Sequence, residues 1–128
     1  MRHAKDQLSE EKIKKALEDT VKTIDEEKIK RINREIPDKL EGLDTSKSFL
    51  QDLKEKVKLL FVMVNDKEYK LKKEHKLIFL GALLYFLLPV DLIADYIPGL
   101  GFLDDALVLK MVWKSFTDEI ETYKSLRL

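Results

Sequence analysis

The chain has 128 residues, enough for one domain around one hydrophobic core. Lys plus Arg and Asp plus Glu each total 24, so the net charge is +0, which argues against a nucleic-acid partner because such proteins usually carry a basic excess. Cysteine is absent, which excludes disulfides, thiolate metal sites and a cysteine nucleophile. The charged N-terminal stretch lacks the apolar core of a signal peptide, so we expect a cytoplasmic protein.

Helices are predicted from one end of the chain to the other. Proline and glycine are scarce, and no segment sustains the alternation of a strand. The first helical stretch covers 10–36, with Ser9 as its N-cap and a break near Asp25, where the apolar register slips. Pro37 is predicted to end this stretch, and 38–46 to be a polar loop.

A second helix is predicted to follow Ser46, which can cap it. Asn65 and Asp66 mark the turn after it. Its apolar residues recur with the i, i+3, i+4 spacing of a buried helix face: Phe49, Leu50, Leu53, Val57, Leu60, Phe61 and Val64.

The third helix contains the uncharged run 77–90, which Pro89 should stop at about Leu88. A short helix over 92–96, a glycine-containing turn, and a last helix from 104 to about 123 complete the chain. The expected fold is therefore all-α, a compact single-domain bundle of about five helices with a central apolar helix at about 77–88.

The segment 77–109 differs from the rest of the chain in its charges. It contains no Lys or Arg, and its charged residues are Asp91, Asp95, Asp104 and Asp105, set among apolar side chains. Carboxylates on an apolar background are costly unless they cap a helix, form a pair or coordinate an ion. The segment is therefore the candidate functional site.

The aspartates belong to a longer pattern that resembles the signature of the YkvA-like family, a small helical domain of unknown function common in bacteria. Ala94 departs from that pattern, because the family usually has a second proline there. By this resemblance 46–128 form a YkvA-like helical domain and 1–45 a charged amphipathic N-terminal helical region, together one folding unit. The matching motif positions include Tyr85, Pro89, Asp91, Asp95, Pro98, Gly101, Asp104 and Asp105.

Two readings of the aspartates stay open. In the first, Asp91 and Asp104 are helix N-caps, and Asp105 favours the positive end of a helix dipole. In the second, Asp91 and Asp95 share a helix face, and Asp104 and Asp105 close an oxygen cluster for Mg²⁺ or Ca²⁺. Catalysis at this cluster is a further step that the sequence does not demand, so no catalytic residue is assigned.

Membrane association is the other open question. About fourteen uncharged residues are fewer than the roughly 20 that a membrane span needs. We expect a soluble helical domain in which any membrane contact is peripheral and led by the lysines of 67–76, with a shallow re-entrant hairpin as the alternative. Because Asp66, Glu68 and Glu74 are interleaved with these lysines, a solvated helix face is the favoured interpretation of the cluster, over a membrane-proximal one. His75 among them is expected to be solvated, and Gly81 to permit close helix packing.

The sequence thus predicts a non-enzymatic interaction module that binds an unknown protein partner or the membrane surface. The alternative is a divalent-metal-binding protein or metal-dependent enzyme that uses Asp91, Asp95, Asp104 and Asp105. Neither reading needs an organic cofactor.

Overall fold

The computed structural model describes residues 11, 14–15, 17–43, 45–87 and 101–128, with residues 101–107 described by their backbone only. Within these ranges the protein is helical with short connections and contains no strand, which confirms the all-α prediction. A helical segment at 17–22 is followed by α2 (Glu26–Glu41), α3 (Ser48–Asn65), α4 (Lys73–Leu87) and α6 (Gly101–Arg127).

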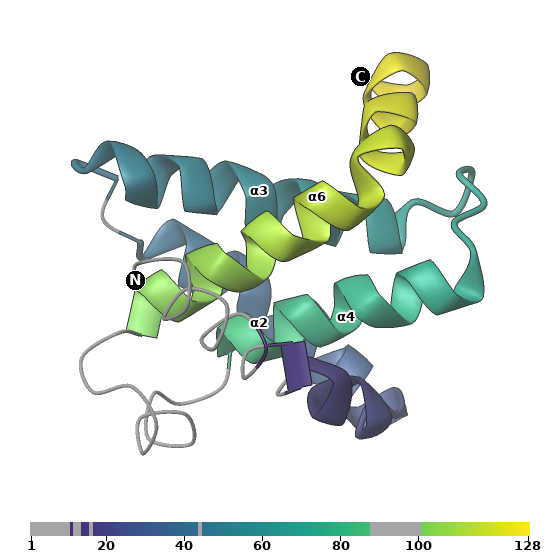
Figure 1. Ribbon diagram of the computed structural model, residues 1–128, viewed down its shortest axis with the longest axis horizontal. Coiled ribbons are helices and arrows are strands. Elements are labelled where there is room, and N and C mark those ends of the chain that lie inside the picture. The colour runs from purple at the N-terminus through teal and green to yellow at the C-terminus, as the bar shows by residue number, and fades with distance from the viewer. Residues whose placement is uncertain (1–10, 12–13, 16, 44, 88–100) are drawn as a thin grey trace.

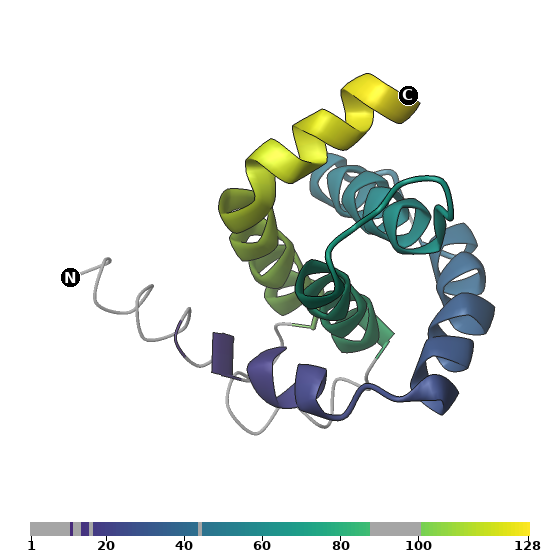
Figure 2. The same ribbon diagram turned by 90° about the vertical axis from the view of Figure 1, so that its right-hand side faces the viewer.

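Helix α4 lies at the centre of the bundle, as predicted for the apolar run. It contacts α2, α3 and α6, and the other helices surround it when the molecule is viewed along its length (Figure 2). Every residue from 79 to 87 is buried, including Phe79 and Leu83. A helix that is apolar on all sides requires this position, because any face turned to water would expose apolar surface.

Gly81 lets the helical segment 17–22 approach α4 closely, as expected. A Cβ atom on Gly81 would lie 2.5 Å from Cγ2 of Val21 and 3.4 Å from Cδ1 of Leu17. The missing side chain therefore sets the distance between the two backbones.

Helix α2 confirms one expectation and corrects two. The chain breaks near Asp25 as predicted, and the Asp25 carboxylate caps α2 by accepting a hydrogen bond from the Lys28 amide at 2.9 Å. Pro37, however, does not end the helix, and the predicted loop 38–46 is helical up to residue 41. The reason is packing: Ile36 and Leu40 continue a buried stripe across Pro37, and this burial outweighs the backbone hydrogen bond that proline cannot donate.

Helix α3 buries most of the predicted stripe, although Phe49 at its start is 43% exposed. Its N-cap is Lys47 rather than Ser46, and the Lys47 side chain makes no capping hydrogen bond. The helix ends at Asn65, and Asp66 follows as its C-cap, as predicted. The next helix starts at Lys73.

Helix α6 bends at Phe116, whose φ of −123° and ψ of 27° are not helical. Just after this point the Thr117 hydroxyl donates to the Trp113 carbonyl, a bond of the kind that bends helices. The bend directs the last turns of α6 away from the bundle axis (Figure 1). Ile120 and Tyr123 on those turns are nevertheless buried.

Candidate functional site

The four predicted aspartates fall at the edge of what the structure describes. Asp91 and Asp95 lie outside the described residues, as do Pro89 and Pro98 of the same motif. Capping by Asp91 and coordination by all four therefore stay predictions.

The remaining motif residues are placed as follows. Tyr85 is buried in the last turns of α4, at 2% exposure. Gly101 is the first residue of α6, so Asp104 and Asp105 lie inside this helix. The prediction that Asp104 is the N-cap is wrong, because the helix starts three residues earlier. Both residues still belong to the first turns of α6, near the positive end of the helix dipole.

The end of α4 that precedes the motif is stabilised by Lys39 of α2. Its ammonium group donates to the carbonyl of Phe86 and lies 4.3 Å from the centroid of the Phe86 ring. Carbonyls in the last turn of a helix have no partner within the helix, and a cation there also complements the dipole. Lys39 therefore stabilises the last turn of α4.

The opposite end of α4 carries the basic residues, which we call the lysine segment: Lys67, Lys70, Lys72, Lys73 and Lys76. All five side chains are exposed. Among the described residues, no acidic side chain forms an ion pair with any of them. Since α4 rises about 1.5 Å per residue, the lysine segment lies about 20 Å along the helix from the motif end.

The acidic neighbours of the lysine segment are engaged elsewhere. Asp66 accepts hydrogen bonds from Nε of Arg127 at 2.8 Å and from the Tyr123 hydroxyl at 2.9 Å. Glu68 forms an ion pair with Arg127 at 3.0 Å. The hydrogen bond from Arg127 lowers the pKa of Asp66 to about 2, with Tyr123 and the Glu68 amide acting in the same direction against burial. Residues at the end of α6 thus bind the carboxylates of Asp66 and Glu68, which lie among the lysines in the sequence.

A second polar cluster connects the lysine segment to α6. Glu119 accepts a hydrogen bond from the Tyr69 hydroxyl at 2.5 Å and lies 3.2 Å from Nδ1 of His75. The bond from Tyr69 lowers the pKa of Glu119, while burial raises the pKa of Tyr69 to about 12, and the contact with Glu119 adds to that rise. The Tyr69 ring also packs edge-on against Tyr123 at 4.9 Å. These contacts hold the loop that carries the lysines in one conformation.

No pattern in the sequence predicted this cluster. His75 was expected to be solvated, but it is only partly exposed, with its ring 4.8 Å from that of Phe116. The partners are 44 to 61 residues apart along the chain, so no local spacing connects them. Only the packing of α6 beside α4 brings Glu119 to His75.

The part of the chain that the structure describes contains no metal-ligand cluster. No group of three or more His, Asp or Glu side chains in that part of the chain could hold a metal ion. No helix in the described ranges is both long enough and apolar enough to cross a membrane.

These features define the protein as an all-helical domain with a buried apolar helix and an exposed basic segment. Comparison with known proteins then identifies the motif segment: residues 75–111 match the family model described as "Protein of unknown function (DUF1232)". The chain is also 44% identical over 52 residues to the "Uncharacterized membrane protein YkvA" of Bacillus subtilis (strain 168). The YkvA-like resemblance predicted from the signature is thereby confirmed for this segment.

The similarity is local. The aligned residues make up 41% of this chain and 49% of the relative, so the chain spans about half the length of the relative it matches. No solved structure matches the chain.

Proposed function

We propose that this protein is a non-enzymatic interaction module that docks on an anionic membrane surface through the lysine segment. The observation that supports this most directly is the exposure of five lysines that form no ion pair with described residues. Each lysine near an anionic bilayer contributes about 1 kcal/mol of attraction, so five are enough for reversible binding. The relative from Bacillus subtilis is named a membrane protein, which is consistent with such a location.

The two polar clusters beside the lysine segment support the same proposal. Arg127 forms ion pairs with Asp66 and Glu68, and Glu119 contacts Tyr69 and His75. These three carboxylates therefore have partners other than the five lysines at ion-pair distance. A basic surface that is fixed before binding also loses less conformational freedom on contact.

A vesicle flotation experiment tests the proposal. The protein is mixed with vesicles of phosphatidylcholine alone or with about a third phosphatidylglycerol, at low and high salt. We expect binding to the anionic vesicles only, and release by salt because surface electrostatics is screened. Flotation with both kinds of vesicle, or retention at high salt, would contradict a peripheral electrostatic contact and favour the re-entrant alternative.

A charge-matched pair of variants localises the contact. The test variant replaces four members of the lysine segment by glutamine: Lys67, Lys70, Lys72 and Lys76. The control replaces four lysines of the first two helical stretches, of which all are exposed: Lys14, Lys15, Lys22 and Lys30. We expect the test variant to bind anionic vesicles roughly a thousandfold more weakly and the control to bind almost normally. Equal losses would show that net charge alone attracts the protein.

A further inference from the structure

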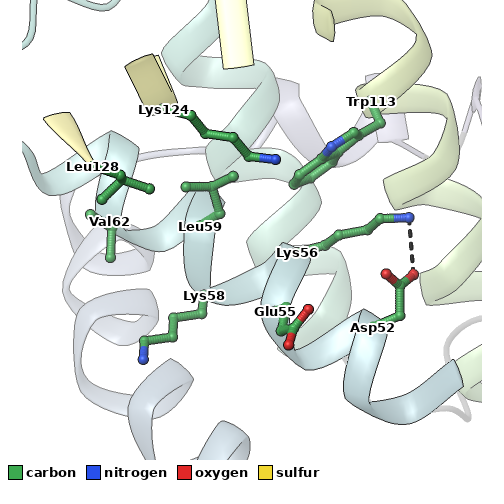
Figure 3. Close-up of a pocket in the computed structure, with 9 residues that line it drawn as sticks. All are labelled: Asp52, Glu55, Lys56, Lys58, Leu59, Val62, Trp113, Lys124 and Leu128. Atoms are coloured by element: carbon green, nitrogen blue, oxygen red, sulfur yellow. Dashed lines mark ion pairs between the residues drawn. The ribbon is translucent and has the colours of Figure 1, made fainter. Parts of the chain in front are cut away.

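A groove of about 470 Å³ lies between α3 and the C-terminal part of α6. Helix α3 contributes Leu59 and Val62 to it, α6 contributes Trp113, and Leu128 follows the end of α6. Figure 3 shows these four side chains as an apolar row along the groove. The volume falls within the range of sites that bind small molecules.

The charged residues of the groove gather at one end of this row. The ammonium group of Lys56 lies 5.6 Å from the centroid of the Trp113 ring, and the Lys124 side chain extends toward the same ring (Figure 3). Val62 and Leu128 at the other end are 38% and 77% exposed. The groove therefore has two ammonium groups beside the tryptophan and apolar side chains beyond it.

Both ammonium groups already have a carboxylate partner. Asp52 is paired with Lys56 at 3.0 Å and orients it, while Glu121 lies 3.7 Å from Lys124. Glu55 and Lys58 also line the groove, but in Figure 3 both lie away from the apolar row. An added anion beside Trp113 would meet two ammonium groups, each with coordination to spare, since an ammonium group has three donors.

We propose that this groove binds a single-chain fatty acid, with its carboxylate beside Trp113 between Lys56 and Lys124. The acyl chain runs along Leu59 toward Val62 and Leu128. One polar end and one apolar end match an amphiphile, and burying the chain removes apolar surface of both partners from water. A second copy of the protein fits less well, because a two-fold contact across the groove would place equal lysines opposite one another.

The proposal does not rest on membrane docking, because no member of the lysine segment lines the groove. Trp113 is the only tryptophan of the chain, so its fluorescence reports on the groove alone. The full chain is titrated with decanoate below its micelle-forming concentration, and in parallel with decyltrimethylammonium, which has the same chain and the opposite charge. We expect a saturable blue shift with decanoate and none with the cationic amphiphile.

Three single variants sharpen the test. Lys124→Gln removes one ammonium group at an exposed position and should weaken decanoate binding about threefold to tenfold. Lys72→Gln makes the same change in the lysine segment, outside the groove, and should leave binding unchanged. Val62→Glu places a carboxylate along the acyl chain at an already exposed site and should abolish the shift.

Three results would overturn the proposal. The first is the absence of a saturable change with decanoate, and the second is an equal response to the cationic amphiphile. The third is a shift in Trp113 fluorescence that follows protein concentration without any amphiphile, together with dimer formation by sedimentation, because the occupant would then be a second copy. Circular dichroism of each variant confirms that the helices are intact before these results are read.

Discussion

Replacing Gly81 by alanine probes the contact between α4 and the helical segment 17–22. At an exposed helix position this change stabilises a protein by up to about 1 kcal/mol, because alanine has the higher helix propensity. Here the new Cβ would lie 2.5 Å from Cγ2 of Val21, more than 1 Å inside an ordinary carbon–carbon contact. Since valine is stiff at χ1 and its own Cα is 3.7 Å from the same point, the segment itself must shift.

Overpacking of this kind costs about 1–3 kcal/mol, which exceeds the gain in helix propensity. We therefore expect Gly81→Ala to lower the free energy of unfolding by about 1 kcal/mol. In a Val21→Ala background the clashing methyl group is absent, so the same change should instead stabilise the protein by about 0.5 kcal/mol. The sign of the change in unfolding free energy thus depends on the side chain at position 21.

Urea denaturation followed by far-ultraviolet circular dichroism measures all four members of this cycle. Gly42→Ala serves as the control, because its φ of −81° suits alanine and the nearest atom to the new Cβ, the Asp38 carbonyl oxygen, is 3.6 Å away. That variant should be neutral or slightly stabilised. A Gly81→Ala variant that is stabilised with Val21 present, or equally destabilised in both backgrounds, would refute the close-contact explanation.

Other perturbations test the remaining contacts. The pKa of Asp66 is lowered from 3.8 to about 2, so the stability that this carboxylate contributes is present above about pH 4 and is lost toward pH 2. When the urea midpoint is measured against pH, Arg127→Gln should therefore show a smaller loss of stability between about pH 4 and pH 2. The pKa of Tyr69 is raised from 10.0 to about 12, so stability should also fall between about pH 10 and 12, and less so in Tyr69→Phe. Lys39→Met should cost about 1 kcal/mol in thermal or urea unfolding, through loss of its bond to the Phe86 carbonyl and its contact with the ring. If the aspartates cap helices, added Mg²⁺ or Ca²⁺ should leave the melting temperature unchanged, whereas a rise that disappears in Asp91→Asn would establish the metal alternative.

The elements of this fold were predictable from the sequence where one local signal acted alone. The uncharged run gave the central helix, and the register slip gave the break at Asp25. Prediction failed where burial competed with a local signal. Pro37 has the chemistry of a helix terminator, yet Ile36 and Leu40 bury their side chains across it.

The candidate site divides in the same way. The lysine segment could be predicted directly, because a cluster of lysines is evident in the sequence and lysines are usually exposed. The contacts of Glu119 and Arg127 beside it could not, since nothing in the local sequence of the last helix distinguishes either residue. What selects them is the bend at Phe116, which turns the end of α6 toward the lysine segment.

This arrangement separates the two surfaces of the module. Residues 88–100 of the motif follow the end of α4, where Lys39 donates to the Phe86 carbonyl, whereas the lysine segment runs from the loop before α4 into its first turn, beside the contacts of Glu119 and Arg127. Because α4 is about 20 Å long, both of its ends contact one flat bilayer only if α4 lies parallel to it. If α4 instead stands upright on the lipid, the lysine segment faces the headgroups and the end of α4 at Leu87 lies farther from them. The flotation variants, applied with and without substitutions at Asp104 and Asp105, distinguish these orientations, since only a parallel helix makes vesicle binding depend on both ends.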